Sequence, residues 1–394
     1  MRILFLCHRY LDTTLGGVAE FLHHLPLALK VHDAEVIIYT RASKDGPNRL
    51  ASPEILENHI PHFSGPFLKP RFFISKKELQ PFLSLCEKEK IDLIHAQGTY
   101  RAGFMAMHAH KQTGIPYIVT SHSDISAVNS QRIQRGNIKR RCKKVLEKAN
   151  FVTHLAPAMQ EASDSIHVTN HKSQIIHNGI DVAAWEKVLN QPEQDYMLAI
   201  GRLEPEKGFP LLIDAYAGLR KKGFRTSLVI AGTGSIEKEL EQQARNYGFN
   251  VLTDFRDTSS IPSESIIFPG YIRAQAKKDL FSHAKLVLFA TQPQACEEAF
   301  GIVQLEAMAA GKPLIASDIA AARYLQSRGM QALLVTPDSQ HAWTEAMHAL
   351  LYDDNLRHVM GQNNQKAVKQ FDWIHIAKEY RVVYEAVLTE KTLR

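Results

Sequence analysis

Several features that would point to a specialised class of protein are missing from this sequence. No apolar run approaches the roughly 18 residues of a membrane-spanning helix, and the first apolar run, within residues 1–8, is too short for a signal peptide. The four cysteines form no Cys-x-x-Cys pair, so neither a zinc site nor a disulfide framework is indicated. Low-complexity tracts and repeats of fixed period are also absent. These absences favour a globular protein of the reducing cytoplasm.

The length and the pattern of apolar residues predict two domains of the same α/β architecture. A chain of 394 residues is too long for one ordinary core. Short apolar runs alternate with helical patterns, which predicts parallel sheets covered by helices on both faces, in two doubly wound units. The expected strands are Ile3–Leu6, Val36–Tyr39, Leu93–His95, Tyr117–Thr120, Phe151–His154, Ile175–His177, Met197–Ile200, Ser227–Ala231, Ile266–Phe268, Leu286–Phe289, Leu314–Ala316 and Leu333–Val335. The expected boundaries give a first domain at 1–182, a polar linker at 183–195, a second domain at 195–371 and a closing helix at 372–394, capped by Asp372.

The most informative stretch is Glu297–Pro313, which reads EEAFGIVQLEAMAAGKP. An expected strand precedes it, and the residues after Gly301 have a helical pattern. A helix start offers free backbone N–H groups and the positive end of the helix dipole, and both favour phosphate. Glu298 then lies in the loop before the helix, and Glu306 lies about one turn inside it. Either glutamate alone could be an ordinary surface residue. Because carboxylates only accept hydrogen bonds, the pair suits a ligand with hydroxyl donors as well as phosphate, such as a ribose or a hexose.

A second group of charged residues follows the expected strand Met197–Ile200. Residues 201–208 read Gly-Arg-Leu-Glu-Pro-Glu-Lys-Gly, so one loop carries both Arg202 and Lys207 between glycines. Arginine offers a planar fork for two phosphate oxygens, and lysine offers a point charge. Together the two cations can offset the charge of a diphosphate.

A weaker signal follows the first strand. Gly16 and Gly17 open a helical pattern, at a point where glycine lets the backbone approach a ligand closely, although glycines there also serve ordinary turns. The dinucleotide fingerprint is not complete, because its third glycine and its acidic residue are missing. Pro26 lies within the helical pattern and is expected to kink the helix or end it early.

Two of these motifs carry a family resemblance. The segment Glu298 to Glu306 resembles the Glu-x7-Glu signature of GT4-type retaining glycosyltransferases (glycosyltransferase group 1), and residues 201–208 resemble their Gly-Arg-x4-Lys-Gly pattern. The resemblance covers nearly the whole chain. It implies the GT-B architecture, in which two Rossmann-like doubly wound domains face a central cleft. The first domain is then the acceptor side, the second binds the nucleotide-sugar, and the closing helix crosses back to the first domain.

The resemblance also implies roles for individual residues. Arg202 and Lys207 neutralise the leaving nucleoside diphosphate. Glu298 accepts hydrogen bonds from hydroxyls of the sugar, and Glu306 accepts them from the ribose diol. His122, which ends an expected strand at the mouth of the first sheet, resembles the family's histidine that lies over the donor sugar. The other positions that the resemblance assigns to donor binding are Gly16, Gly17, Tyr271, Ile272, Phe300, Gly301 and Ile302.

The activity implied by the resemblance is retaining transfer of a hexose without a metal ion or another cofactor. The donor is a UDP- or GDP-sugar, and the acceptor is a hydroxyl of a glycan, a lipid-linked compound or a small molecule, in cell-envelope polysaccharide or glycolipid synthesis. No Asp-x-Asp triplet, which metal-dependent GT-A transferases use, occurs in the sequence. Two alternatives stay open: a GT-B-fold sugar-nucleotide 2-epimerase, and a non-catalytic nucleotide-sugar-binding protein.

The sequence departs from the family pattern after Asp318. The family usually continues with two glycines and a glutamate, whereas this chain has Ile-Ala-Ala-Ala-Arg-Tyr at 319–324. Alanine adopts a positive φ only at a cost, so the local turn is expected to differ. Such a difference would affect which donor the protein uses.

The net charge of +6 is concentrated in one segment. Between Arg132 and Lys148 eight basic residues oppose one acidic residue, and Val145 and Leu146 give the expected helix an apolar edge. A solvated helix face is one interpretation, and docking onto an anionic membrane surface or a phosphorylated acceptor is the other. The residues expected to make such a contact are Arg140, Arg141, Lys143 and Lys144. No nucleic-acid-binding motif accompanies the charge.

Overall fold

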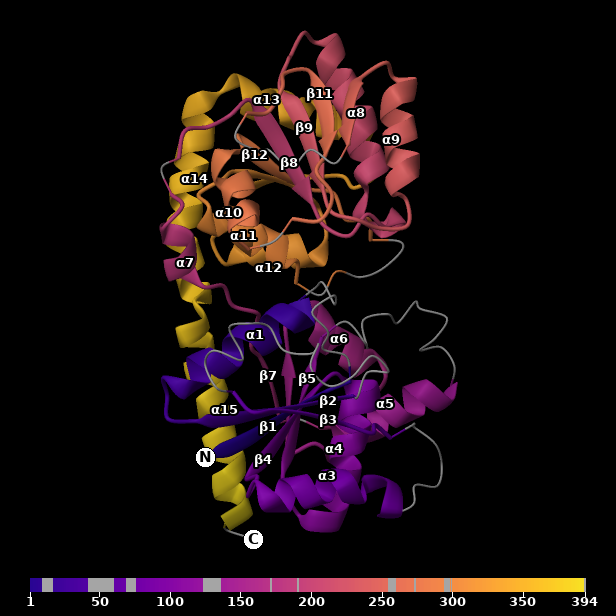
Figure 1. The fold of residues 1–394 in the computed structure, drawn as a ribbon, viewed down its shortest axis with the longest axis vertical. Helices are drawn as coiled ribbons and strands as arrows, with labels where there is room; N and C mark the ends of the chain where they lie inside the picture. Colours follow the sequence, from indigo (N-terminus) through magenta and orange to yellow (C-terminus); the bar gives the residue numbers. More distant parts are fainter. Residues whose placement is uncertain are drawn as a thin grey trace. The chain divides into compact units, whose positions relative to one another are not determined.

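The computed structural model consists of two compact units (Figure 1). It describes residues 1–8, 17–41, 60–68, 76–122, 136–170, 172–189, 191–253, 260–272, 274–293, 298 and 300–392. The first unit comprises Met1–Gly179 together with Asp372–Arg394, and the second comprises Ile180–Phe371.

In the described part of the first unit, seven parallel strands form one sheet in the order β3-β2-β1-β4-β5-β6-β7. The strands are β1 (Arg2–Cys7), β2 (Glu35–Arg41), β3 (His62–Gly65), β4 (Leu93–Gln97), β5 (Tyr117–Ser121), β6 (Phe151–His154) and β7 (Ser173–Ile175). The chain runs from β1 outward to β2 and β3 and then returns to β4 on the other side. The direction of strand order therefore reverses between β1 and β4.

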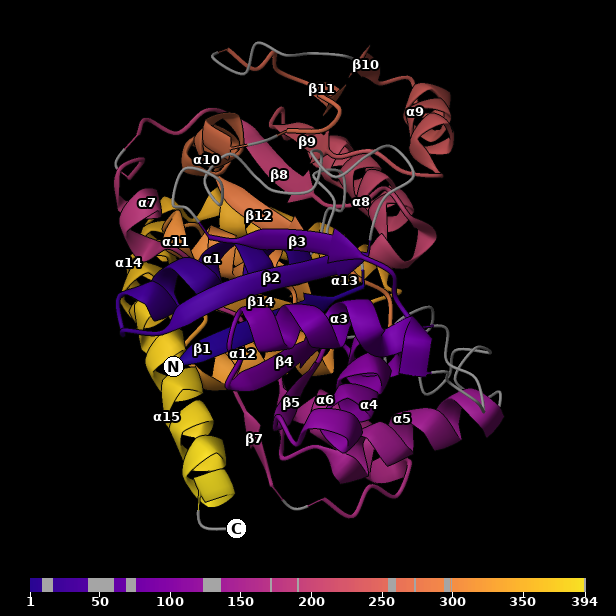
Figure 2. The same ribbon diagram turned by 60° about the horizontal axis from the view of Figure 1, so that its bottom comes forward.

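Helices cover both faces of this sheet because its central strands are apolar on both faces. Leu4 and Leu6 of β1 pack with α3, α4 and α5, whereas Ile3 and Phe5 pack with α1 and α15. Figure 2 shows α3, α4 and α5 close together. The helices of this unit are α1 (Gly17–Lys30), α3 (Lys76–Lys88), the π-helix η2 (Thr99–Gly103), α4 (Phe104–Thr113), α5 (Gly136–Lys148), α6 (Pro157–Ser165) and α15 (Trp373–Thr392).

The closing helix begins where the sequence predicts. The Oδ1 atom of Asp372 accepts a hydrogen bond from the Ile374 backbone N–H at 2.8 Å, which caps the first turn of α15. The buried Tyr384 hydroxyl of this helix lies 2.9 Å from Nδ1 of His95 on β4. The helix is thus part of the core of the first unit.

The sequence predicts that Pro26 kinks α1 or ends it early, and the structure contradicts the early end. The helix continues through Pro26 to Lys30. Proline removes one backbone hydrogen bond, but Phe21, Leu22 and Leu25 are fully buried in the same helix. Burial of each such side chain contributes about 2 kcal/mol, so packing outweighs the lost bond.

The described residues of the second unit also form one parallel sheet, with the order β10-β11-β9-β8-β12-β13-β14. Its strands are β8 (Tyr196–Ile200), β9 (Ser227–Ala231), β10 (Asn250–Thr253), β11 (Ser265–Phe268), β12 (Leu286–Phe289), β13 (Leu314–Ser317) and β14 (Ala332–Val335). The order reverses between β8 and β12, as in the first unit between β1 and β4. Both units are therefore doubly wound.

Helices of the second unit lie on both faces for the same reason. Right-handed crossovers place α8 and α9 on one face, and place α10, α11 and α12 on the other, because the chain travels in opposite directions along the sheet. Trp343 of α13 is fully buried in the core under α8 and α9. The helices are α7 (Val182–Glu186), the 3₁₀ turn η4 (Pro205–Lys207), α8 (Phe209–Lys221), α9 (Glu237–Asn246), α10 (Ala274–His283), α11 (Ile302–Ala309), α12 (Ala320–Ser327), α13 (Gln340–Tyr352), α14 (Asp354–Val368) and η5 (Lys369–Phe371).

Residues 183–195, predicted as a linker, belong to the second unit. The units divide after Gly179. Trp185 of α7 is buried, with its ring edge-on to Phe281 at 5.4 Å between ring centres. Because the stretch is polar overall, its composition does not reveal that Trp185 packs into the second unit.

Each predicted strand has a counterpart in the sheets, with ends that agree within two residues. The largest displacement is that of β7, which spans Ser173–Ile175 rather than Ile175–His177. β3 and β10 are additional strands that the sequence did not predict, and both lie at a sheet edge.

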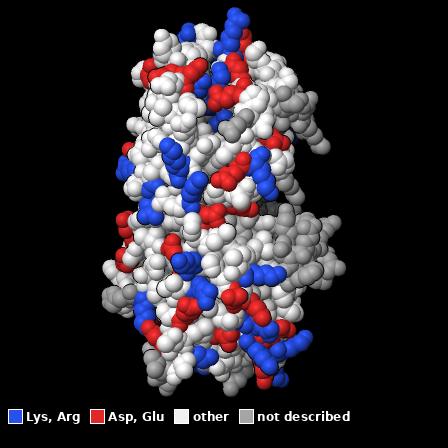
Figure 3. Space-filling view, turned by 90° about the vertical axis from the view of Figure 1, so that its left-hand side faces the viewer, with Lys and Arg blue, Asp and Glu red and all other residues white. Residues whose placement is uncertain are grey.

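The charged side chains are not segregated on the face that Figure 3 presents, where Lys and Arg are interspersed with Asp and Glu. Among the described helices, none combines the length and apolar character needed to cross a membrane.

Candidate functional site

The predicted donor-site residues of the second unit gather at the carboxyl edge of its sheet. In open α/β sheets ligands bind beside the carboxyl ends of the strands, at the point where strand order reverses. Here that point lies between β8 and β12. The loop after β8 carries Arg202 and Lys207, and the loop after β12 carries Glu298. The topology therefore brings the two sequence motifs to the same place.

Close backbone contact holds the loop after β8. The Gly201 N–H donates to the carbonyl oxygen of Ala231 at the end of β9, at 3.0 Å. Gly232, the next residue, has a φ of +139°, and a Cβ atom there would lie 1.8 Å from the Gly201 carbonyl oxygen. Only glycine permits this approach. The backbone immediately before Arg202 is fixed as a result.

The same loop is joined to the loop after β12. Gly208 has a φ of +70°, and a Cβ atom there would lie 2.1 Å from the Ala290 carbonyl oxygen. The Gln292 N–H donates to the carbonyl oxygen of Glu206 at 2.8 Å. These contacts place Lys207, between Glu206 and Gly208, against the second loop.

Lys207 and Glu298 form an ion pair across the two loops. Their side chains are 21% and 19% exposed. Arg202 is 52% exposed, and its Nη2 atom lies 3.1 Å from Oε1 of Glu206. The site thus contains one lysine held by a carboxylate and one largely exposed guanidinium that can turn toward an anion.

The helix predicted after Gly301 is α11. Gly301 has a φ of +77°, and a Cβ atom there would lie 2.9 Å from the Phe289 ring, so glycine is required at this helix start. The first-turn N–H groups of the helix point toward the carboxyl edge of the sheet. Glu306, in the second turn, is 5% exposed and forms an ion pair with Lys277 of α10. Both predicted carboxylates are therefore ion-paired with lysines.

Phe300 supports the loop rather than facing outward. Its side chain is buried, and its ring lies 6.3 Å from the Phe371 ring and 6.5 Å from the Tyr324 ring, measured between centres. Because the Phe300 side chain is buried, only the backbone of this residue is available to contact a ligand. Ile302, the first residue of α11, is partly buried.

Tyr271 and Ile272 follow β11 beside the β9 loop. The Gly232 N–H donates to the Gly270 carbonyl oxygen at 2.8 Å, which ties the two loops together. Tyr271 is exposed and Ile272 is partly buried. Both lie at the same edge of the sheet as Arg202.

The departure after Asp318 produces a turn without a positive φ. Ile319 is extended, with a φ of −120°, and α12 begins at Ala320. The Asp318 carboxylate accepts two hydrogen bonds from Arg323, at 2.5 and 2.9 Å. These bonds hold the pKa of Asp318 below its usual value. The alanines that follow, at 320–322, begin α12 and need no positive φ.

In the first unit, His122 follows β5 and is 5% exposed. Its Nε2 atom lies 2.9 Å from Oε1 of Gln97, the last residue of β4. The Phe21 ring meets the imidazole edge-on at 5.3 Å between ring centres. Burial lowers the pKa of His122 to about 4, so the ring is neutral near pH 7.

The glycine pair after β1 is only partly described. Gly16 lies outside the described residues, and Gly17 is the first residue of α1. Glu297 and Ala299 of the second unit also lie outside them.

The predicted basic helix is α5. It buries Cys142, Val145 and Leu146 against the first sheet. Lys143 lies 3.6 Å from Glu147, one turn along the helix. Arg140 and Lys144 are exposed, and Arg141 and Lys143 are partly exposed. Arg132 lies outside the described residues.

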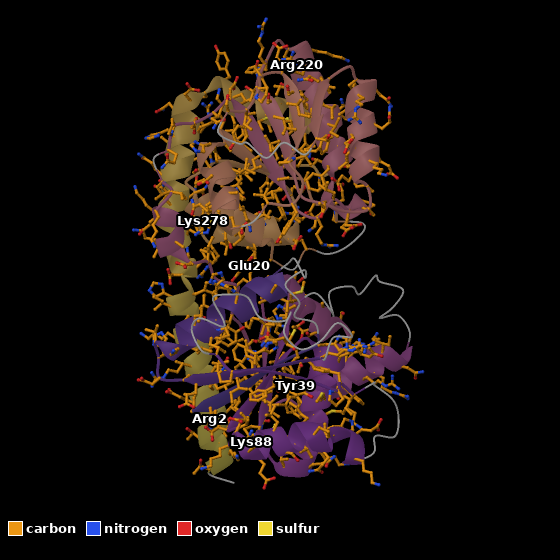
Figure 4. The ribbon with its side chains drawn as sticks, viewed as in Figure 1. Arg2, Glu20, Tyr39, Lys88, Arg220 and Lys278 are labelled. Atoms are coloured by element: carbon orange, nitrogen blue, oxygen red, sulfur yellow. The ribbon has the colours of Figure 1, made fainter. Side chains whose placement is uncertain are left out.

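The sequence did not single out Lys277 or Gln97. Lys277 pairs with Glu306 from a different helix. Its neighbour Lys278, labelled in Figure 4, instead donates to the Ala184 carbonyl oxygen at 3.3 Å. Nothing in the local pattern separates the two lysines. Gln97 lies two residues beyond the predicted strand Leu93–His95, and nothing in the sequence connects it with His122. Within the described residues, no group of three or more His, Cys, Asp or Glu side chains has metal-binding geometry.

Cations, carboxylates and a helix start lie together at the carboxyl edge of a doubly wound sheet, and groups of this kind suit an anionic ligand. Two family models identify the protein further. "Glycosyltransferase Family 4" matches residues 15–184, and "Glycosyl transferases group 1" matches residues 181–367. Together they cover most of the chain, which therefore belongs to the GT4-type glycosyltransferases of group 1.

Individual relatives agree with this assignment. The D-inositol 3-phosphate glycosyltransferase of Corynebacterium glutamicum is 24% identical, over 96% of this chain and 93% of that protein. The glycogen synthase of Mycobacterium tuberculosis is 25% identical, over 98% and 95%. Anabaena HepE, solved in complex with UDP, is 20% identical with a TM-score of 0.76, over 98% of this chain and 100% of that one. This structural likeness confirms the predicted GT-B fold.

Proposed function

We propose that the chain is a retaining, metal-independent hexosyltransferase that uses a nucleoside-diphosphate sugar. The observation that carries the proposal is the joining of the two loops that bear Lys207 and Glu298 at the reversal point of the second sheet. A diphosphate there has Arg202, Lys207 and the first turn of α11 as partners. Glu306 accepts from the ribose hydroxyls, and Glu298 accepts from hydroxyls of the sugar.

The chemistry requires charge stabilisation more than a protein base. The bond between the sugar's anomeric carbon and the phosphate oxygen breaks, which leaves negative charge on the nucleoside diphosphate. Arg202, Lys207 and the backbone N–H groups stabilise this charge, and preorganised groups of this kind usually supply the largest share of a rate enhancement. The acceptor hydroxyl forms the new bond on the face that the diphosphate leaves, and its proton passes to the departing phosphate oxygen. His122 is the further residue to which we assign contact with substrate.

The choice of substrates follows the relatives only in part. HepE was solved with UDP, which supports a uridine nucleotide as the first donor to test, and a GDP-sugar is the second. The relatives named as D-inositol 3-phosphate glycosyltransferase and glycogen synthase support a hydroxyl acceptor but differ in its identity. We place the reaction in the cytoplasm, in cell-envelope polysaccharide or glycolipid synthesis.

A panel of nucleotides tests the proposal. The purified protein is mixed with UDP-, GDP- and ADP-sugars, with EDTA or with Mg²⁺, and binding is followed by thermal shift and turnover by release of the nucleoside diphosphate. We expect one nucleotide class to stabilise the protein and its sugar to be consumed equally with and without Mg²⁺. Strict dependence on Mg²⁺ would refute the metal-independent mechanism. Formation of an epimeric sugar-nucleotide would identify a 2-epimerase, and stabilisation without turnover a binding protein.

We also propose that α5 docks onto an anionic surface at the inner face of the plasma membrane. Its apolar side is buried in the first unit, and its other sides carry Arg140, Arg141, Lys143 and Lys144. Each cation near an anionic membrane contributes about 1 kcal/mol. Replacement of all four with glutamine should therefore abolish sedimentation with vesicles that contain phosphatidylserine, whereas replacement of Lys88, Lys90, Lys221 and Lys222 should not. Equal sedimentation of both variants would show that α5 is an ordinary solvated helix and does not dock onto the membrane.

A further inference from the structure

Gln97 and His122 form a buried polar pair at the carboxyl edge of the first sheet. Gln97 ends β4 and His122 follows β5, and each residue is 5% exposed. Oε1 of Gln97 lies 2.9 Å from Nε2 of His122. The amide nitrogen of Gln97 is buried and has no hydrogen-bond partner in the described part of the chain.

The pair determines which ring nitrogen of His122 carries the proton. Burial keeps the imidazole neutral, so the ring has one N–H group. His95, on the neighbouring strand β4, is also buried, and its two ring nitrogens contact the hydroxyls of Tyr384 and Thr120. Because the carbonyl oxygen of Gln97 can only accept a hydrogen bond, the proton is on Nε2 and Nδ1 keeps its lone pair. Phe21, edge-on to the ring, restricts its rotation.

We propose that Gln97 is a positioning residue for the transfer reaction: it holds the Nε2–H tautomer of His122, so that Nδ1 accepts a hydrogen bond from a substrate hydroxyl. The inference rests on the proposed function, in which His122 contacts substrate. It adds a residue from a neighbouring strand that acts only through the histidine. The group recognised is a neutral hydroxyl, because a neutral Nδ1 lone pair accepts from a donor and repels an anion.

Two substitutions separate positioning from a merely structural role. Gln97→Met keeps the volume and removes the hydrogen bond, and Gln97→Glu keeps the acceptor oxygen and adds a negative charge beside Nε2–H. Gln80→Glu, on the exposed surface of α3, is the matched control. Thermal unfolding of each variant checks the fold. The ring is observed by two-bond ¹H–¹⁵N correlation spectra of protein labelled in histidine, and the His122 signals are identified by their loss in His122→Asn.

We expect the wild-type spectra to show an Nε2–H tautomer that does not titrate between about pH 5 and 8. In Gln97→Glu the added carboxylate stabilises the protonated ring, so the His122 signals should titrate within that range, and kcat should fall most at low pH. Gln97→Met should lower kcat at least about 10-fold with little change in the donor KM. Gln80→Glu should match the wild type in both readouts.

An Nδ1–H tautomer in the wild type, or an unchanged kcat in Gln97→Met, would overturn the proposal. A wild-type protein that turns over no nucleotide-sugar would refute the proposed function instead. The tautomer spectra would still decide in that case whether Gln97 sets the ring of His122.

Discussion

Lys207→Met should lower kcat/KM for the nucleotide-sugar about 100-fold or more while the protein keeps its melting temperature. Lys207 loses two roles in this variant. It no longer stabilises charge on the leaving diphosphate, and it no longer neutralises Glu298, with which it is paired. The carboxylate left beside the phosphates then repels them. Binding of the free nucleoside diphosphate, measured by calorimetry, should weaken together with turnover.

The second role can be isolated with a double variant. Glu298→Gln in the Lys207→Met background removes the repulsion, so it should restore part of the nucleotide affinity but not the turnover. Lys222→Met is the matched control, because Lys222 also pairs with a carboxylate, at 2.9 Å from Glu345, on the surface. Wild-type kinetics in Lys207→Met, or an equal loss in Lys222→Met, would contradict the assignment of Lys207 to the diphosphate.

Gly232→Ala should destabilise the second unit by about 4 kcal/mol or more, which corresponds to a fall of about 10 °C in melting temperature. The new Cβ atom would lie 1.8 Å from the carbonyl oxygen of Gly201, and the backbone would be left at a φ of +139°. Neither group can retreat easily, because Gly201 is hydrogen-bonded to β9 and Gly232 to Gly270. Relief of the clash requires movement of the loop that carries Arg202.

Gly248→Ala provides the comparison. Gly248 also has a positive φ, +77°, but nothing lies within 4 Å of an added Cβ atom. Only the backbone strain remains, at about 1 kcal/mol. Calorimetric scans of the two variants should therefore differ by several degrees. Equal melting temperatures would show that the β8 and β9 loops are not held as closely as the structure has them.

The sequence predicted the buried strands because their signal is local. β12 and β13 are short apolar runs with every residue buried, and such runs between helical patterns mark the centre of a parallel sheet. β3 and β10 lack this signal. They lie at sheet edges, and their residues are exposed or only partly buried. Pairing with a neighbour makes them strands, and the neighbour cannot be identified from their own residues.

Two errors have the same origin. Pro26 opposes a helix locally, yet α1 continues because its apolar residues pack against the sheet and α15. Residues 183–195 are polar overall, yet Trp185 fastens them to the second unit. In each case a tertiary contact overrides the local preference.

For the same reason, the sequence predicted some parts of the candidate site and missed others. Gly208 and Gly301 are needed for close approaches at positive φ, and each stands next to the charged residues of its own loop, so motif spacing was sufficient to predict both loops. A contact between residues of two separate helices or strands has no characteristic spacing in the sequence. Lys277 lies 29 residues from Glu306, and Gln97 lies 25 residues from His122. Both pairs could be identified only from the structure.

The account depends most on where the nucleoside diphosphate binds. A crystal structure of the protein with the nucleotide selected by the binding panel, grown in the presence of EDTA, tests this directly. We predict phosphate oxygens within hydrogen-bonding distance of Arg202, Lys207 and the first-turn N–H groups of α11, with the ribose on Glu306. Phosphates bound elsewhere on the chain, with Lys207 and Glu298 still paired to each other alone, would contradict the account.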